Sequence, residues 1–228
     1  MPRQLSFDLP VRTALGRADF FVSPANALAV AAIDTSASWP QGKLLLIGPQ
    51  GAGKTHLAMV WATEAGAAVV AARDLGAQDL ATLAQNPAIL IEDVETLAGD
   101  PLAETRLFHL HNLALANQAR LLMTAPCPAV RLPFVLPDLA SRLQACATAT
   151  LNPPDDALLA SVLVKLFSDR QVAAPPSLIT YLLDRIDRSF ASANAIVAAI
   201  DARALAEGRP VGRALAAEVL DLWEAPGA

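Results

Sequence analysis

The sequence predicts an α/β protein in which a five-stranded parallel sheet, covered by helices, is followed by a small all-helical domain. Two observations support this fold class. Short apolar segments alternate with segments of helical spacing up to about residue 151, which is the order expected for a parallel sheet with helices on both faces. After Pro153 and Pro154 every apolar segment has helical spacing, so the second part of the chain is expected to contain helices alone.

The expected strands are short runs of mainly apolar residues. The first, residues 43–47, is continuously apolar after its lysine and ends at Gly48, which is typical of a buried strand. In chain order, the strands are expected at residues 43–47, 67–72, 88–91, 120–124 and 147–151.

The expected helices of the same part have apolar residues three and four positions apart. Ser23 is expected to cap the first of them, with Pro24 at its first position. In chain order, these helices are expected at residues 24–38, 55–65, 102–118 and 139–145.

The C-terminal part is expected to form four helices, the third of which ends at Gly208 with Pro210 beyond it. These helices are expected at residues 155–170, 176–188, 189–207 and 212–223. The chain is thereby divided into an N-terminal arm, an α/β domain and a helical lid domain, at residues 1–20, 21–152 and 153–228.

Composition limits the classes of function. Apolar residue types make up 54% of the chain and charged types 17%, so a sizeable core is expected. The net charge is −5 and no basic run occurs, which argues against strong direct binding to DNA. No apolar run is long enough to span a membrane and no signal peptide is visible. Cys127 and Cys146 lack metal-ligand spacing, so a reducing, cytoplasmic location is expected.

A phosphate-binding loop is expected between the first strand and the next helix. The run Gly48-Pro-Gln-Gly51-Ala-Gly53-Lys54-Thr55 fits the pattern G-x-x-x-x-G-K-[ST]. In such a loop the backbone N–H groups surround phosphate oxygens, Lys54 reaches the β- and γ-phosphates, and Thr55 offers its hydroxyl to Mg²⁺. A tight glycine turn without a ligand is the alternative. The expected nucleotide contacts are Gly48, Gly51, Ala52, Gly53, Lys54, Thr55 and His56.

Two acidic residues, Glu92 and Asp93, follow the third expected strand. One carboxylate can hold the water shell of Mg²⁺ together with Thr55, and the other can polarise an attacking water. Ordinary solvation at the end of a strand is the alternative. Because nucleotide hydrolases more often place Asp first, the order of these two residues favours nucleotide binding with poor hydrolysis.

The segment Leu136-Pro-Asp138-Leu-Ala-Ser141-Arg142-Leu143 resembles a segment of the DnaA-related AAA+ proteins, and of their Hda-type members, that ends in an arginine finger. The resemblance implies that Arg142 reaches across a subunit interface and stabilises charge on a γ-phosphate, an effect of ~10³–10⁵ in rate. It also implies an AAA+ P-loop domain followed by a helical lid. The alternative for Arg142 is an ion pair with Asp138 one helical turn away.

Other segments agree with this resemblance and with bound ADP or ATP. Phe21 and Val22 fall in the stretch that lies against the adenine in this family, and Thr124 falls on the strand that senses phosphate. The lid arginine of the family aligns with Ala191, and Arg188 lies three residues earlier, so it shares a helix face and can substitute. The alanine at the position of the lid arginine, like the order of Glu92 and Asp93, favours weak intrinsic hydrolysis.

The N-terminal arm is similar to the short peptide by which Hda-type proteins and other replication proteins bind the sliding clamp. An extended arm loses conformational freedom on binding, so a modest affinity is expected. An arm that packs on its own domain is the alternative. The matching residues are Gln4, Leu5, Phe7 and Leu9.

The family resemblance implies a regulator of replication initiation that, with the sliding clamp, stimulates ATP hydrolysis by DnaA and so inactivates it. The DNA-reading domain that follows the lid in DnaA has no counterpart before Ala228, which favours a protein partner; a homo-oligomer is a further possibility. The alternatives are a clamp-tethered adaptor without trans-activation, a helicase-loader-type ATPase, and a small-molecule kinase or self-sufficient ATPase. Arg73 is the only Lys or Arg between Thr55 and Glu104, which argues against a kinase.

Overall fold

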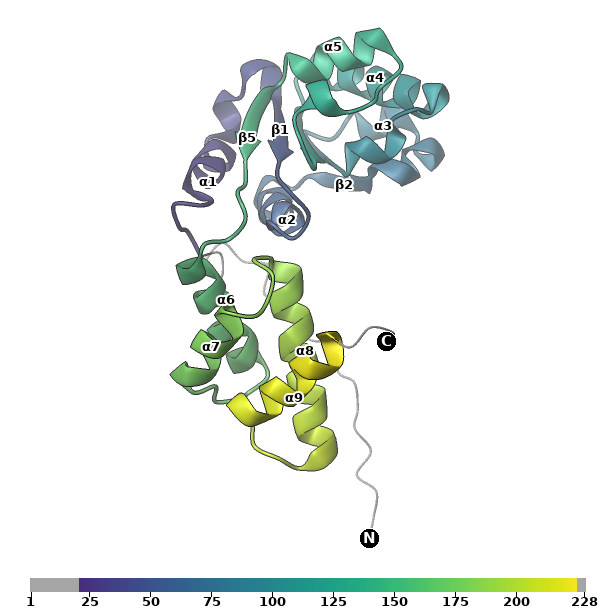
Figure 1. Cartoon of the computed structure of the whole chain (residues 1–228). Helices are drawn as coiled ribbons and strands as arrows, with labels where there is room; N and C mark the ends of the chain where they lie inside the picture. Colours follow the sequence, from purple (N-terminus) through teal and green to yellow (C-terminus); the bar gives the residue numbers. More distant parts are fainter. Residues whose placement is uncertain (1–20, 225–228) are drawn as a thin grey trace.

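The structure is a computed structural model that describes residues 21–224. A sheet with helices on both faces lies at one end of the molecule and a group of four helices lies at the other (Figure 1). Helix α2 lies beside the junction between the two parts. No helix in the described part of the chain is long and apolar enough to cross a membrane.

The sheet has five strands, all parallel, in the order β2-β3-β4-β1-β5. This arrangement confirms the predicted fold class. Strand β1 lies between β4 and β5, with Leu44 paired to Leu122 on one side and to Ala147 on the other. The strands are β1 (Lys43–Ile47), β2 (Ala68–Ala71), β3 (Ala88–Glu92), β4 (Arg120–Ala125) and β5 (Ala147–Thr150).

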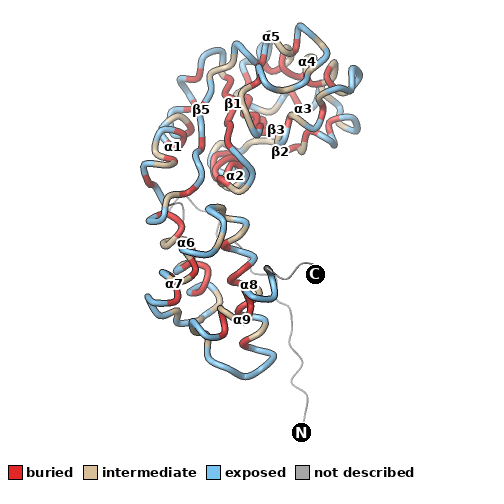
Figure 2. Tube along the Cα trace, in the orientation of Figure 1, coloured by how far each residue is buried: buried red, intermediate tan, exposed pale blue. Residues whose placement is uncertain are grey.

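Alternate residues of the buried strands enter two separate apolar clusters, because successive side chains of a strand point to opposite faces. Leu45 and Ile47 of β1 pack with α3, α4 and α5, whereas Leu44 and Leu46 pack with α1 and α2. Figure 2 shows the buried residues concentrated along the strands and the inner sides of these helices. The helices are α1 (Ala27–Asp34), α2 (Lys54–Ala65), α3 (Leu80–Leu83), α4 (Pro101–Ala116) and α5 (Pro137–Gln144).

The four C-terminal helices form a third apolar cluster of their own, centred on buried residues such as Phe167, Leu182 and Ile196. Gly208 ends α8 in the left-handed conformation, with φ of 62°, as the sequence predicts. The helices are α6 (Asp156–Asp169), α7 (Pro176–Leu183), α8 (Phe190–Glu207) and α9 (Arg213–Glu224). Short 3₁₀ turns connect elements of the sheet part: η2 (Ser36–Ser38), η3 (Pro40–Gly42), η4 (Ala72–Ala77), η5 (Val94–Leu97) and η6 (Ala129–Arg131).

Two predicted helices are shorter in the structure. The first begins after Asn26, not at Pro24, and ends at Asp34, because the Thr35 hydroxyl bonds back to Ala31 O and a 3₁₀ turn follows. The helix predicted at 176–188 ends at Leu183. The residues after it form a loop, since Ser189 adopts an extended conformation and accepts a hydrogen bond from Ser192 N to cap α8.

Candidate functional site

The glycine-rich loop joins β1 to α2 at the carboxyl end of β1, as the motif requires. Gly51 and Gly53 have φ of 78° and 92°, a conformation that other residues adopt only with strain. Lys54 begins α2, and its Nζ donates to Gly48 O at 2.8 Å and to Pro49 O at 3.2 Å. The loop is therefore closed around its own lysine, at the N-terminus of a twelve-residue helix.

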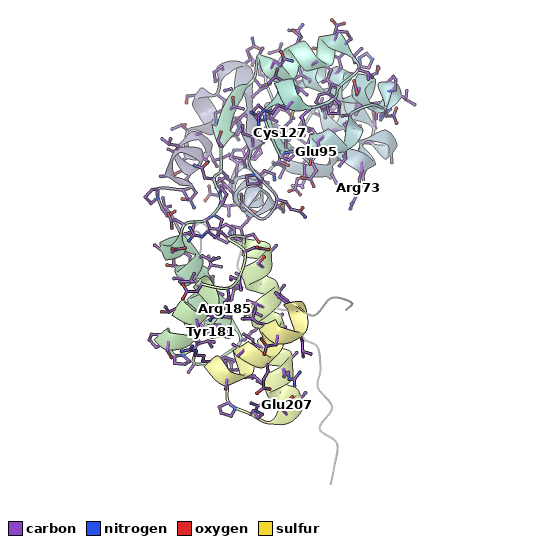
Figure 3. The ribbon with its side chains drawn as sticks, in the orientation of Figure 1. Arg73, Glu95, Cys127, Tyr181, Arg185 and Glu207 are labelled. Carbon is purple, nitrogen blue, oxygen red and sulfur yellow. The ribbon has the colours of Figure 1, made fainter. Side chains whose placement is uncertain are left out.

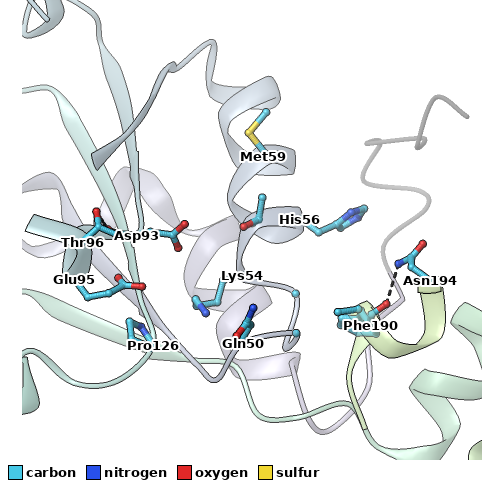
Figure 4. Close-up of a pocket in the computed structure, with 14 residues that line it drawn as sticks. Gln50, Lys54, His56, Met59, Asp93, Glu95, Thr96, Pro126, Phe190 and Asn194 are labelled. Carbon is cyan, nitrogen blue, oxygen red and sulfur yellow. Dashed lines mark hydrogen bonds between the residues drawn. The ribbon is translucent and has the colours of Figure 1, made fainter. Parts of the chain in front are cut away.

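A cavity of about 680 Å³ opens between this loop, the end of β3 and the start of α8 (Figure 4). That volume is in the range typical of small-molecule sites. Among the described residues that line it, Lys54 alone carries a fixed positive charge, and Asp93 and Glu95 supply carboxylates. The lining residues are Gln50, Gly51, Gly53, Lys54, Thr55, His56, Met59, Asp93, Glu95, Thr96, Pro126, Phe190, Ala191 and Asn194.

The acidic side of the cavity differs from the expected pair of carboxylates. Glu92 is not among the lining residues. Burial raises its pKa, a side-chain interaction with Thr55 opposes this shift, and Asp93 adds to it. Glu95, from the 3₁₀ turn η5, lines the cavity opposite Lys54 in Figure 4. Its pKa is also raised by burial and by Asp93, and lowered by Lys54. One carboxylate oxygen of Glu92 and one of Glu95 are buried without a hydrogen-bond partner among the described residues.

Thr124 on β4 is fully buried, and its hydroxyl accepts a hydrogen bond from Asp93 N at 2.8 Å. Asp93 has φ of 57°, so Thr124 stabilises a strained turn at the end of β3. Asp93 lines the cavity, whereas Thr124 is not among the lining residues. Thr124 therefore contacts the site through the backbone of Asp93.

The start of α8 packs directly on the glycine-rich loop. Phe190 N donates to Gly51 O at 2.9 Å. A Cβ added to Gly51 would lie 2.5 Å from Ser189 Cβ, and one added to Gly53 would lie 2.8 Å from Phe190 Cε2. The helical part thus closes one side of the cavity, and both glycines are required by this contact as well as by their φ angles.

Arg188, expected to replace the missing lid arginine, does not line the cavity. Its Nη2 forms an exposed ion pair with Asp156 Oδ1 at 2.9 Å. The α8 residues that do face the cavity are Phe190, Ala191 and Asn194, and none of them is charged. Contact between Arg188 and a nucleotide stays a prediction, and it requires this ion pair to break.

Four further predicted contacts are not among the residues that line the cavity. Phe21 and Val22 are exposed, at 41% and 54%, and are not among the lining residues. Gly48 is packed against Leu151, because a Cβ there would lie 2.5 Å from Leu151 O. Ala52 is buried, and its N–H donates to Pro49 O. Gln4, Leu5, Phe7 and Leu9 lie outside the described residues.

The residues present fit a nucleotide phosphate with a hydrated Mg²⁺. The glycine-rich loop, the N-terminus of α2 and Lys54 supply positive potential at one place. Thr55, with Glu92 behind it and Asp93 beside it, offers the oxygen ligands that Mg²⁺ prefers. No group of three or more His, Cys, Asp or Glu able to hold a metal by itself occurs among the described residues. A metal here would consequently share its ligands with phosphate and water.

Arg142 lies at the other end of the sheet. It is exposed on α5, the helix that Figure 1 shows farthest from the helical part. Its charge acts on Lys43, the first residue of β1, and on His111 of α4. The glycine-rich loop begins beyond Ile47, about 13 Å along the strand. Arg142 makes no ion pair with Asp138 or with another described residue. The ion pair that was the alternative to an arginine finger is therefore absent from the described residues.

Sequence reasoning missed Glu95, Phe190 and Asn194. A signal for Glu95 was present, since it follows Glu92 and Asp93 within the same acidic segment. Phe190 and Asn194 carry no local signal. They reach the cavity only because the helical part folds back on the loop, which is a tertiary contact between residues far apart in sequence.

No protein-family model matches the chain. Among solved structures, it is similar to domain III of the replication initiation protein DnaA from Thermotoga maritima, with a TM-score of 0.82 and 20% identity over 96% of this chain and 100% of that one. It is similar to AMPPCP-bound DnaA from Aquifex aeolicus, with a TM-score of 0.70 and 17% identity over 81% of this chain and 64% of that one.

A third similar structure is the RuvB Holliday junction branch migration motor of Thermotoga maritima. The TM-score is 0.63 and the identity 18%, over 86% of this chain and 65% of that one. The chain therefore spans about two thirds of the length of these two longer proteins and all of the isolated DnaA domain. The similarity establishes the fold, which is shared with domain III of DnaA and with RuvB.

Proposed function

We propose that this protein is a nucleotide-binding regulator of replication initiation that acts with the sliding clamp to stimulate ATP hydrolysis by DnaA. The observation that carries the proposal is the position of Arg142. It is exposed, has no carboxylate partner among the described residues, and lies at the end of the sheet opposite its own phosphate-binding loop. An arginine so placed is available to another molecule's nucleotide and out of reach of its own.

Nucleotide binding rests on the cavity between the loop and α8. Lys54 and the backbone N–H groups of the loop bind the phosphates, and Thr55 with the nearby carboxylates binds Mg²⁺ through water. The similar DnaA structure carries AMPPCP, a nucleotide analogue, which supports a ligand of this class. Both ADP and ATP fit this description.

Intrinsic hydrolysis is proposed to be weak. The transition state for phosphoryl transfer gains most from positive charge near the γ-phosphate. Here Lys54 is the only fixed cation among the described lining residues, and Arg188 is held by Asp156. Asp93 and Glu95 add carboxylates to the lining of the same cavity. The site is accordingly better suited to holding a nucleotide than to turning it over.

In the proposed reaction, Arg142 enters the nucleotide site of DnaA. Water attacks the γ-phosphorus there, the bond to the β–γ bridging oxygen breaks, and ADP and inorganic phosphate are formed. The Arg142 guanidinium stabilises negative charge on the transferred group, and an arginine supplied in this way accelerates hydrolysis by ~10³–10⁵. The residues of this chain take no proton in that step.

The N-terminal arm is proposed to bind the sliding clamp, because its sequence matches a clamp-binding peptide at Gln4, Leu5, Phe7 and Leu9. Binding through the clamp would bring the protein to DNA without direct contact, which agrees with a net charge of −5. Tethering also raises the effective concentration of Arg142 near DnaA.

The test is the rate of ATP hydrolysis by DnaA on clamp-loaded DNA, measured with the wild-type protein, with Arg142→Ala and with Arg185→Ala. Arg185 is the matched control, an exposed arginine of the helical part without a carboxylate partner among the described residues (Figure 3). We expect stimulation by the wild type and by Arg185→Ala, and none by Arg142→Ala.

Three other outcomes would reject the proposal in different ways. If Arg142→Ala stimulates as well as the wild type, the trans-acting arginine is wrong. If the wild type binds the clamp without changing the rate, an adaptor is the better description. Stimulation of a helicase-loading reaction in place of DnaA hydrolysis would identify a loader-type ATPase.

A further inference from the structure

Glu104, on the first turn of α4, is a fully buried carboxylate with 0% of its surface exposed. It forms no ion pair with any described residue. A buried carboxylate without a cationic partner is costly unless hydrogen bonds compensate its charge. Its environment must therefore supply several donors.

The donors are three backbone N–H groups from two separate segments. Gly99 N donates to Oε1 at 2.8 Å, from the turn just before α4. Val135 N donates to both oxygens, at 3.0 and 2.9 Å, and Leu136 N donates to Oε2 at 2.7 Å. Hydrogen bonds to an ionised acceptor are about twice as strong as neutral ones. Glu104 thus joins α4 firmly to the segment that precedes α5.

That segment starts the helix that carries Arg142. Leu136 is the N-cap residue of α5 and offers no side-chain cap, and Pro137 follows at the first helical position. The negative charge of Glu104 beside this N-terminus also complements the helix dipole. Arg142 is six residues further on, about 9 Å along the axis. The start of α5 therefore takes its position from Glu104.

The other end of α5 is held by the same helix α4. His111 lies two turns after Glu104 on α4, which places both residues on one face. Its Nε2 is 4.0 Å from Cys146 Sγ, and Cys146 Sγ in turn donates to Arg142 O at 3.3 Å. Leu139 and Leu143 bury the inner face of α5. Helix α5 is consequently fixed at both ends and along its length.

We propose that Glu104 is a positioning residue for Arg142: it fixes the start of α5 so that the guanidinium is presented in one orientation. This inference rests on the proposed function of Arg142. A glutamine at this position would keep one acceptor oxygen but would place an NH₂ donor against backbone N–H donors. The segment at Val135 and Leu136 would then lose its anchor while the rest of the fold, including the nucleotide cavity, keeps its contacts.

The experiment measures stimulation of DnaA ATP hydrolysis by the full chain carrying Glu104→Gln, Arg142→Ala, or both. Asp100→Asn is the matched control, because Asp100 caps the same helix by accepting from Leu102 N and Ala103 N. Nucleotide binding and hydrogen exchange at Val135 N and Leu136 N are measured on each variant. If Glu104→Gln does not fold, Glu104→Asp takes its place, since it keeps the charge but withdraws it from the donors.

Glu104→Gln is expected to lower the maximal stimulated rate by about tenfold to a hundredfold, the effect of a misplacement of about 1 Å. The half-saturating concentration and nucleotide affinity should stay within about twofold, because neither depends on the orientation of one side chain. The amides of Val135 and Leu136 should exchange faster. In the Arg142→Ala background, Glu104→Gln should have no further effect, and Asp100→Asn should behave as the wild type.

Three results would overturn the inference. A folded Glu104→Gln variant with full stimulation would show that the anchor does not matter for Arg142. A Glu104→Gln variant whose nucleotide affinity or half-saturating concentration changes by much more than twofold would show a general structural role. Full stimulation by Arg142→Ala would reject the proposed function itself and this inference with it, and is distinguished by that single variant.

Discussion

Lys43, the first residue of β1, is buried to 1% exposure without a carboxylate partner among the described residues. Its Nζ lies 3.1 Å from His111 Nδ1. Burial lowers the pKa of Lys43 from 10.5 to about 8, the charge of Arg142 acts in the same direction, and Cys146 opposes it. The Lys43→Met variant removes this buried charge and keeps an unbranched side chain of similar length.

The sign and size of the effect follow from these pKa values. Between pH 8 and 10.5 the unfolded chain holds the Lys43 proton and the folded protein has released it, so this group makes stability rise with pH. At ~1.36 kcal/mol per pKa unit, the rise is about 3 kcal/mol. At pH 7 the Lys43→Met variant avoids the cost of burying a charged amine. It also leaves His111 Nδ1 without its donor, which costs about 1 kcal/mol. We expect the variant to be about 2 kcal/mol more stable at pH 7.

The assay is urea unfolding of wild type and Lys43→Met at several values from pH 7 to 10.5. The gain in stability should shrink as pH rises, and the variant should become less stable than the wild type near pH 10.5. Burial raises the pKa of the Cys146 thiol, a contribution of opposite sign that the comparison largely removes. Lys165→Met, a lysine paired with Asp169 on the surface of α6, is the control. A difference that is constant with pH would refute the reasoning.

Two further predictions concern the cavity and the buried histidine. Gly53→Ala adds a Cβ 2.8 Å from Phe190 Cε2 at a φ of 92°, so affinity for a fluorescent ATP analogue should fall by about tenfold or more. Gly66→Ala, with φ of 61° and nothing within 4 Å, should leave that affinity unchanged. Burial, with Lys43, lowers the pKa of His111 to about 4, so stability should fall as pH falls from 6.5 to 4, by up to about 3 kcal/mol. His111→Gln should lack this component in urea unfolding, and an unchanged pH profile would contradict it.

The sheet was predictable because its strands are buried on both faces. A run such as residues 43–47 is apolar at consecutive positions after its lysine, and all five of its residues are buried. The strand expected at residues 147–151 has a weaker signal, because it alternates alanine and threonine, and the structure has it at residues 147–150. Strand order was not predicted, since it depends on which crossovers pack together.

Short and polar elements were harder to predict. Helix α3, Leu80–Leu83, was missed because four residues are too few to show a helical period, although Asp79 caps it by accepting from Ala81 N. The end of α7 at Leu183 was misplaced because the following residues, up to Arg188, continue an acceptable helical pattern. The residues after Leu183 lead to Ser189, which packs against Gly51 of the glycine-rich loop, and that contact is tertiary.

In the candidate site too, features with a local sequence signal could be predicted and features that depend on tertiary contacts could not. The glycine-rich loop could be placed from sequence because its residues are consecutive and act through their backbone. The role of Thr124 could not, because the acceptor for Asp93 N depends on β3 and β4 being neighbours. Glu104 gave no signal at all, since a glutamate in the first turn of a helix is ordinary and its bonds to Val135 and Leu136 span more than thirty positions.

The two ends of β1 carry different parts of the proposed chemistry. The glycine-rich loop follows its carboxyl end, and Lys43 at its amino end lies within the influence of Arg142. A connection between them runs through a short stretch of chain: Glu95 lines the cavity, and Gly99, four residues later, donates to the carboxylate that also holds the start of α5. Variants of Lys54 therefore test nucleotide binding, and variants of Arg142 test activation in trans. Glu104, on α4, accepts hydrogen bonds both from Gly99 and from the segment before α5, so its variants test the connection between the two.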